Sequence, residues 1–354
     1  MEGAKKQAGK TLAERLPGER VPSVGRGAVA RMLLVAALLT LALNYVAVRL
    51  SPPAKRSFDG MVVERKWQLA GTSDAEIVVV GDSSGNFGAD AAVLGSELGA
   101  DAVNLCTYGR FQIRGAAWML ERVLDARERP PALVLVVLGA RTFALSPDGF
   151  TFAQLPLGPL AFRGGSLAPA LPARHALQFV AARALPLFAQ STSYGRALRT
   201  GEWEPDLSRL AIEDDGTARI PAANPRAVPR FADRTIAEYG AVEGDVPSSA
   251  ERAAARALVR AADERGFDLV FATSPIWEEM ATRPEHVAFE GRVRAFLEEA
   301  CAVTERARVL PGDAPRFSAD ELENPFHVTP DAAGTYSKEV ARRLRALGLP
   351  RAAR

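Results

Sequence analysis

Cysteine and histidine are scarce in this sequence, which has two cysteines and three histidines among its 354 residues. Cys106 and Cys301 lie far apart and have no spacing typical of zinc ligands, and the scattered histidines do not complete a ligand set. The sequence therefore predicts no metal and no cofactor. A disulfide between the two cysteines stays open for an oxidising compartment, because sequence alone does not tell whether the sulfurs meet.

An excess of one charge is also missing. The chain has 44 Lys and Arg against 42 Asp and Glu, a net charge of +2. No basic stripe interleaved with aromatic residues occurs, which excludes a nucleic-acid partner. Internal repeats and low-complexity segments are absent as well. The length and the apolar share of 48% fit one large domain or two ordinary ones, plus short appendages.

One long apolar run lies near the N-terminus. No charged residue occurs from Met32 to Val48, within a mostly apolar stretch at 28–50. Because an α-helix rises about 1.5 Å per residue and the hydrocarbon core is about 30 Å thick, roughly 20 residues are needed to span it. We expect an uncleaved transmembrane anchor at 28–50, because a polar tail precedes it and Tyr45 and Arg49 crowd its end. A cleaved signal peptide or a buried core helix is the alternative.

Basic residues are more frequent before this run than after it. Those before it are Lys5, Lys6, Lys10, Arg15, Arg20, Arg26 and Arg31. The positive-inside rule then predicts a cytoplasmic tail at 1–27 and an extracytoplasmic C-terminal part, anchored in the cytoplasmic membrane of a bacterium. Prolines at 52–53 predict a linker at 51–74, and we place the domain at 75–350.

Beyond residue 75, apolar runs alternate with helical patterns. The runs lie at 77–80, 133–138, 269–272 and 309–310, and apolar residues recur at helical spacing over 113–124 and 289–300. Ser248 and Glu251 make a capping-box pattern, and Gly266 can end the helix that follows. Continuous apolar strands separated by amphipathic helices predict an α/β three-layer sandwich with a mostly parallel sheet.

The stretch at 142–246 interrupts this alternation, because it is rich in Pro and Gly and has little periodicity. A structureless connection of that length is unusual in a compact domain. We therefore predict an inserted cap region over the site. Packing of this region on the membrane surface is the alternative.

The first apolar run leads directly into Gly81-Asp82-Ser83-Ser84-Gly85. Catalytic groups of open α/β sheets gather at the carboxyl ends of strands, so Ser83 is well placed to be a nucleophile. An ordinary turn with Asp82 or a serine as helix cap is the alternative. A phosphate-binding loop is disfavoured, because the segment lacks the P-loop lysine.

Four short segments, in their order along the chain, resemble the blocks of the SGNH (GDSL) hydrolase superfamily. They are Gly81-Asp82-Ser83, then the segment 103–109 ending in Gly109, then Gly139-Ala140-Arg141, and last Asn324-Pro325-Phe326-His327. The third block normally reads Gly-x-Asn and the fourth Asp-x-x-His, so this chain departs from the pattern at Arg141 and Asn324. The resemblance covers residues 75–347.

The resemblance implies a role for each matched residue. Ser83 would be the nucleophile and His327 the base, with Asn324 at the place of the orienting acid. The backbone N–H groups of Ser83 and Gly109 would bind the oxyanion, and Arg141 would stand in for the third donor. A histidine needs a group that fixes its tautomer and stabilises its positive charge.

Both departures bear on activity. Replacing the aspartate of a serine triad by asparagine costs about 10⁴ in rate. Glu323 or Asp320 could supply the charge that Asn324 lacks. Losing one oxyanion donor costs roughly 10² to 10³, unless Arg141 donates instead. A surface ion pair is the alternative role for Arg141.

The resemblance thus implies an esterase or O-acyltransferase acting on an acylated cell-envelope glycan or polymer. Membrane-anchored, exported members of the superfamily serve polysaccharide O-acetylation or D-alanyl transfer beside membrane-bound O-acyltransferases. We therefore expect the lipid bilayer, an acylated polysaccharide and such an acyltransferase as partners. The alternative is a catalytically inactive glycan-binding or scaffold protein of an envelope acylation complex.

Overall fold

The computed structural model describes residues 25–50, 58–146, 149–153, 155–157, 163–167, 169–185, 199, 211–220 and 222–350. The basic tail predicted at 1–27 falls almost wholly outside these ranges, as do parts of the predicted cap region. The chain divides into two compact units, Met1–Arg49 and Leu50–Arg354.

The described part of the first unit is almost wholly the helix α1 (Arg26–Leu50), which has 25 residues and ends one residue beyond the unit. At about 1.5 Å per residue its length is about 37 Å, which is more than the hydrocarbon core requires. Within it, Gly27–Val46 has a mean hydropathy of 1.9, and none of the most apolar stretch is buried. The helix is thus long and apolar enough to cross a membrane once.

The second unit is an α/β domain built on a five-stranded sheet, in the order β2-β1-β3-β6-β8. Its strands are β1 (Ile77–Gly81), β2 (Ala102–Asn104), β3 (Leu133–Leu138), β6 (Asp268–Thr273) and β8 (Ala307–Val309). Every neighbouring pair is parallel. All residues of β1 and β3 are buried, which explains why both read as continuous apolar runs rather than alternating ones.

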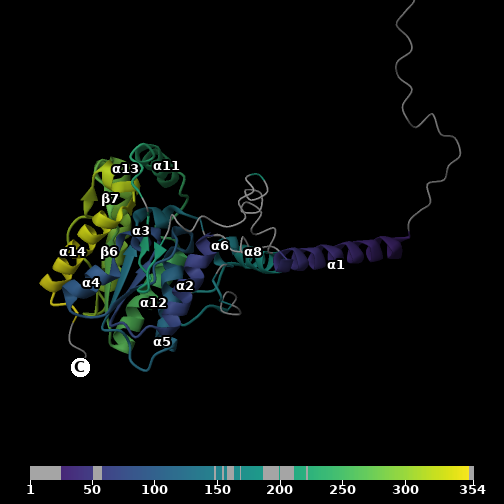
Figure 1. Ribbon diagram of the computed structural model, residues 1–354, viewed down its shortest axis with the longest axis horizontal. Helices are drawn as coiled ribbons and strands as arrows, with labels where there is room; N and C mark the ends of the chain where they lie inside the picture. Colours follow the sequence, from purple (N-terminus) through teal and green to yellow (C-terminus); the bar gives the residue numbers. More distant parts are fainter. Residues whose placement is uncertain are drawn as a thin grey trace, which may run out of the picture. The chain divides into compact units, whose positions relative to one another are not determined.

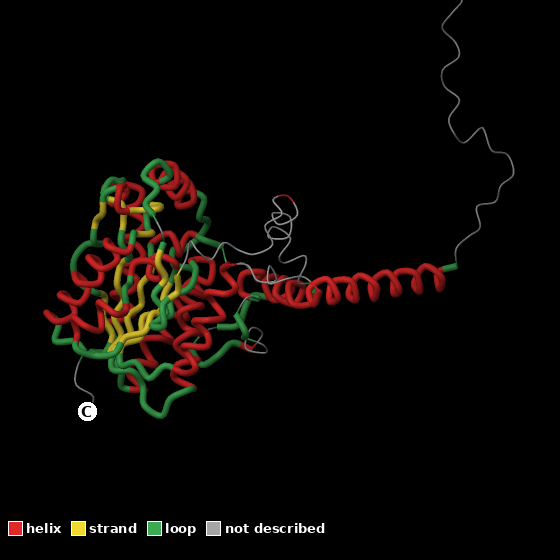
Figure 2. Tube along the Cα trace, viewed as in Figure 1, coloured by secondary structure: helices red, strands yellow, loops and turns green. Residues whose placement is uncertain are grey.

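Helices cover both faces of this sheet, as Figures 1 and 2 show. On one face lie α5 (Gln112–Asp125), α12 (Ser249–Arg265) and α13 (Pro284–Cys301), in contact one after the other. On the other lie α3 (Ser83–Gly88), α4 (Ala91–Leu98) and α14 (Pro330–Ala346), of which α14 contacts both others. The α/β class and the parallel sheet predicted from the sequence are confirmed.

Helix α12 begins and ends as the local sequence indicates. Ser248 is its N-cap and exchanges hydrogen bonds with Glu251 in a capping box, and Gly266 takes the left-handed conformation at its C-cap.

The two cysteines are both free and buried, so the disulfide left open by the sequence does not form. Burial raises the pKa of both thiols, that of Cys301 to about 12.

The prediction of a linker at 51–74 does not hold for residues 58–72. These residues form the helix α2 (Phe58–Thr72), which packs against α5. Val62, Lys66 and Ala70 are fully buried at helical spacing. The spacing of the apolar residues in this segment could have indicated the helix. Charged residues lie between them, and one of these, Lys66, occupies a buried position, so the amphipathic pattern is weak.

The described part of the insertion between β3 and β6 holds several short elements. They are η4 (Ala140–Ala144), α6 (Gly149–Phe152), α8 (Ala173–Ala184), the antiparallel pair β4 (Ala211–Ile212) and β5 (Ala218–Arg219), and α11 (Val228–Gly240). Near the C-terminus, β10 (Leu322–Asn324) and β11 (His327–Val328) form a second antiparallel pair. Helix α11 contacts β10 and η4.

Gly81, the last residue of β1, allows a test of the fold at the point where the site begins. Its φ of +155° disfavours other residues, and a Cβ there would lie 1.8 Å from the carbonyl oxygen of Val137. We expect Gly81→Ala to lower the free energy of unfolding by more than about 3 kcal/mol, measured by thermal unfolding of the full chain in detergent. Gly291→Ala is the control, since nothing lies within 4 Å of a Cβ there. In α13 it should stabilise by about 0.5–1 kcal/mol, and equal effects of the two substitutions would contradict this account.

Candidate active site

The candidate site lies at the carboxyl edge of the sheet. Asp82 follows β1 and caps α3, whose first residue is Ser83. The β10–β11 pair brings His327 to the same edge, in contact with α3. A cavity of about 230 Å³ opens there. It is lined by Asp82, Ser83, Ser84, Tyr108, Gly109, Arg110, Gly139, Arg141, Thr142, Leu145, Thr151, Phe231, Asn324, Phe326 and His327.

The two side chains predicted to be nucleophile and base meet in this cavity. Ser83 Oγ lies 3.0 Å from His327 Nε2, although 244 positions separate the two residues. The imidazole packs on the ring of Phe87, with 4.7 Å between ring centroids. His175 and His286 are not among the lining residues. This geometry suits proton transfer between a serine and a histidine.

A buried carboxylate, that of Asp82, holds the turn that presents Ser83. Its Oδ1 accepts hydrogen bonds from the backbone N–H of Ser84, at 2.8 Å, and from the Ser84 hydroxyl. Its Oδ2 accepts from the N–H of Gly139, at 2.8 Å, and from the hydroxyl of Thr142. Asp82 therefore joins the end of β1 to the end of β3 and also caps α3.

On the far side of the imidazole, two residues compete for Nδ1. The amide nitrogen of Asn324 lies 2.7 Å from it, and the carboxylate Oε2 of Glu323 lies 3.3 Å from it. Asn324 Oδ1 accepts the backbone N–H groups of Phe326 and His327, at 3.1 and 3.2 Å. The amide thus braces the turn between β10 and β11, and Glu323 is the carboxylate in contact with the ring.

Backbone N–H groups suited to an oxyanion also border the cavity. Ser83 begins α3, and the first N–H groups of a helix have no acceptor within the helix. In the part of the chain that the structure describes, the N–H groups of Ser83 and Gly109 donate to no backbone carbonyl group outside the helices and strands. A Cβ at Gly109 would come within 3.1 Å of Thr142 Oγ1, so the wall is tightly packed here.

Arg141 lies in the cavity wall, but its side chain has a protein partner. Its Nε and one Nη donate to the carboxylate of Glu238 on α11, at 2.7 and 3.0 Å. The guanidinium lies over the ring of Phe231, 5.0 Å from the centroid. Burial would raise the pKa of Glu238, but Arg141 and Arg234 lower it below its usual value. The ion pair is partly buried rather than fully exposed, and the oxyanion role of Arg141 stays a prediction.

A polar network that no sequence pattern indicates lies beneath α3. Lys66 of α2 is fully buried and donates to the side-chain oxygens of Asn86 and Asn104, the latter at 3.2 Å. Asn104 in turn donates to the carbonyl oxygens of Gly85 and Ala89, at 3.0 and 2.6 Å, where α3 ends. This network fixes the helix that carries Ser83.

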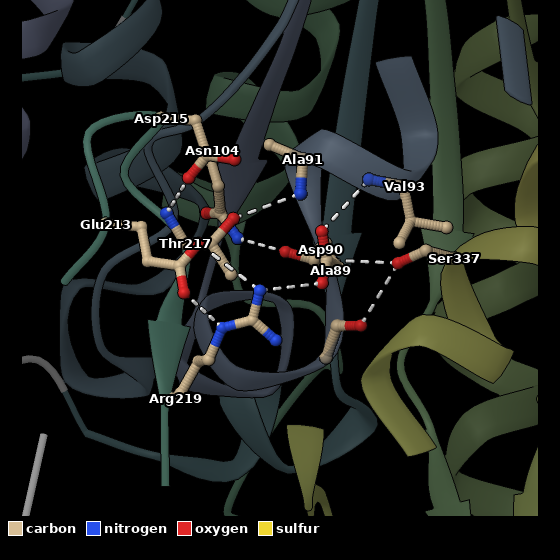
Figure 3. A network of polar contacts seen from close by, with 11 residues as sticks. Ala89, Asp90, Ala91, Val93, Asn104, Glu213, Asp215, Thr217, Arg219 and Ser337 are labelled. Atoms are coloured by element: carbon tan, nitrogen blue, oxygen red, sulfur yellow. Dashed lines mark hydrogen bonds and ion pairs between the residues drawn. The ribbon is translucent and has the colours of Figure 1, made fainter. Parts of the chain in front are cut away.

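The β4–β5 hairpin of the insertion joins this network from the edge of the sheet (Figure 3). The backbone N–H of Asn104 donates to the carbonyl oxygen of Asp215, at 2.8 Å. Arg219 lies 3.2 Å from the carboxylate of Asp90, the N-cap of α4. The N–H of Asp90 donates to Ser337 Oγ of α14, at 2.8 Å. The hairpin is therefore attached to β2, α4 and, through Asp90, α14.

Through Phe87, this hairpin also supports the histidine. Phe87 forms a small buried cluster with Ala218 and Ile220, and its ring is the one that contacts His327. The described part of the insertion thus contributes to the site from behind and in its wall: the hairpin lies behind Phe87, and the cavity is lined in part by Thr142, Leu145, Thr151 and Phe231.

No known protein-family model matches the chain, and no curated protein is significantly similar to it.

Lys66 allows a test of the buried network. Burial lowers its pKa from 10.5 to about 7. Between these pH values the unfolded chain binds more protons than the folded one, so this lysine makes stability rise with pH in that window. We expect the wild-type protein to gain stability relative to Lys66→Met as the pH increases from 7 to about 10, by on the order of a few kcal/mol.

The measurement is chemical unfolding of both proteins at several pH values. Lys338→Met, which changes an exposed lysine of α14, is the matched control and should show no such trend. A constant difference between wild type and Lys66→Met across this range would contradict the prediction.

Proposed function

We propose that this chain is a membrane-anchored, extracytoplasmic SGNH-type esterase or O-acyltransferase that acts on an acylated cell-envelope glycan or polymer through a serine nucleophile. The observation that carries the proposal is the 3.0 Å distance between Ser83 Oγ and His327 Nε2, in a cavity that Gly109 also borders. The order of the four sequence segments supports it further.

The chemistry follows from the proton path. Ser83 Oγ attacks the acyl carbonyl carbon while its proton passes to His327 Nε2, and the carbonyl π electrons move to the oxygen. The N–H groups of Ser83 and Gly109 stabilise that oxyanion. When the carbon–oxygen bond of the ester breaks, Nε2 returns the proton to the departing alcohol. Water or an acceptor hydroxyl then attacks the acyl-serine while His327 takes its proton. The bond between the acyl carbon and Ser83 Oγ breaks, and Nε2 returns the proton to Oγ.

The size and lining of the cavity favour a small acyl group. Its volume of about 230 Å³ lies below the roughly 300–1,000 Å³ typical of sites that enclose a drug-sized ligand. Tyr108, Phe231 and Phe326 give it apolar walls beside the polar groups. A short acyl ester such as acetyl fits this volume, while the polymer that carries it would extend into solvent.

The second candidate is a catalytically inactive protein that binds a glycan or serves as a scaffold. Arg141 favours this reading, because its ion pair with Glu238 at 2.7 Å engages the group at the place of an oxyanion donor. Asn324 favours it too, because an amide does not stabilise an imidazolium as a carboxylate does. The two candidates differ in whether Ser83 is activated.

Activation of Ser83 can be measured with a fluorophosphonate, which labels serines whose hydroxyl is made nucleophilic. We expect the full chain in detergent to be labelled at Ser83, since His327 is positioned to take its proton. Peptide mapping distinguishes Ser83 from the adjacent Ser84. Ser83→Ala should abolish labelling and His327→Ala should slow it by at least about 10². An unlabelled wild-type protein that is folded would favour the binding candidate.

The proposed orientation has a separate test. With a cytoplasmic N-terminus and a single crossing by α1, the C-terminus lies outside the cytoplasm. A reporter that works only in an extracytoplasmic compartment should therefore be active when fused after Arg354. Activity of a cytoplasmic reporter alone at this position would reverse the orientation. Retention of the fusion in the membrane fraction at full length distinguishes an anchor from a cleaved signal peptide.

A further inference from the structure

We infer that Glu323, one residue before the position where the fourth block has its acid, is the positioning carboxylate of His327. The inference rests on the proposed function, because it concerns how that histidine becomes a base. It differs from the residue-by-residue resemblance, which assigns this role to Asn324.

The tautomer of His327 decides whether Nε2 can accept a proton. In a neutral imidazole one nitrogen carries hydrogen and the other has a free lone pair. To take the proton of Ser83, Nε2 must hold the lone pair, so Nδ1 must carry the hydrogen and needs an acceptor. The group next to Nδ1 therefore selects the tautomer: a productive ring has the hydrogen on Nδ1, and an unproductive ring has it on Nε2.

Asn324 favours the unproductive ring. Its Nδ2, 2.7 Å from Nδ1, is a donor, so a bond between them leaves the hydrogen on Nε2. Rotating the amide by 180° would provide an acceptor. However, it would also turn the NH₂ group toward the backbone N–H groups of Phe326 and His327, which now donate to Oδ1. The turn between β10 and β11 therefore holds the amide in its orientation.

Glu323 favours the productive ring. Its Oε2 lies 3.3 Å from Nδ1 and can only accept when ionised, so a bond between them places the hydrogen on Nδ1 and frees Nε2 for Ser83. Its negative charge also stabilises the imidazolium that forms during attack, which a neutral amide does not do. Asn324 Nδ2 lies 3.5 Å from the same oxygen and so helps to hold the carboxylate beside the ring.

The other charged groups near the ring are differently engaged. Asp82 accepts four hydrogen bonds, two from Ser84 of α3 and two from residues that follow β3. Arg141 is paired with Glu238 on α11, and Arg110 is exposed at the cavity rim. Asp331, in the first turn of α14, is exposed. Among the described residues, Glu323 is the one carboxylate with an ion-pair contact to His327.

The test compares Glu323→Gln with the wild-type full chain, using the rate of fluorophosphonate labelling of Ser83 between pH 5 and 9. Gln keeps the shape but loses the charge, so we expect labelling at pH 7 to slow by about tenfold or more. The acidic limb of the pH profile should shift to lower pH, because the imidazolium loses a stabilising charge. The side chain of Glu323 is 45% exposed, so the loss should be smaller than for a buried acid.

A rescue variant separates positioning from a structural role. In Glu323→Gln combined with Asn324→Asp, a carboxylate returns on the other side of Nδ1, and both the rate and the acidic limb should move back toward wild type. Asp320→Asn is the control, because it removes a nearby exposed carboxylate from η7 (Ala319–Glu321) that has no contact with the ring. Its profile should match wild type.

The outcomes distinguish the positioning role of Glu323 from the proposed function. A slower rate with the shifted limb and the rescue supports Glu323. An unchanged rate in Glu323→Gln, or a slower one with an unshifted limb, overturns the role of Glu323 while labelling of wild-type Ser83 leaves the proposed function standing. Absence of labelling in folded wild-type protein overturns the proposed function and this inference with it.

Discussion

The candidate site depends above all on the carboxylate of Asp82. It is 3% exposed and accepts hydrogen bonds from the backbone N–H and the hydroxyl of Ser84 in α3, and from Gly139 and Thr142, which follow β3. A buried charge is tolerated only when its hydrogen bonds are made, so these donors and the carboxylate fix one another. The parallel sheet brings the two strand ends together, and Asp82 converts their proximity into a fixed orientation of Ser83. The first block of the resemblance thus has a structural reason for its middle residue.

His327 is positioned by quite different parts of the chain. It arrives on a hairpin near the C-terminus, and its ring lies against Phe87, which the β4–β5 hairpin supports from behind. That hairpin lies in the stretch at 142–246, whose role as a cap over the site stays a prediction. The ion pair of Arg219 with Asp90, the N-cap of α4, attaches the hairpin to the domain, and the hairpin supports the histidine from outside the cavity through Phe87.

Local sequence predicted those features that depend on local physics. The apolar runs predicted the strands β1, β3 and β6, and the helical spacing predicted α5 and α13. The capping box at Ser248 predicted the start of α12. The meeting of Ser83 with His327 followed from strand ends and the resemblance. The buried Lys66 could not be foreseen, because a lysine in a charged stretch normally points into solvent. Nor could the partner of Arg141, since Glu238 lies 97 residues away in a region without periodicity.

The two positions at which the chain differs from the SGNH pattern that it resembles have a common physical feature. Where the pattern has a neutral amide in its third block, this chain has the cation Arg141, and α11 of the insertion supplies Glu238 to balance it. Where the pattern has an acid in its fourth block, this chain has the neutral Asn324, and the preceding Glu323 lies beside the ring. Relative to that pattern, the charge of the region is redistributed rather than reduced. A partly buried cation without a partner would be costly, which ties Arg141 to α11. The third block and the insertion therefore form one unit, and a change in either has to be matched in the other.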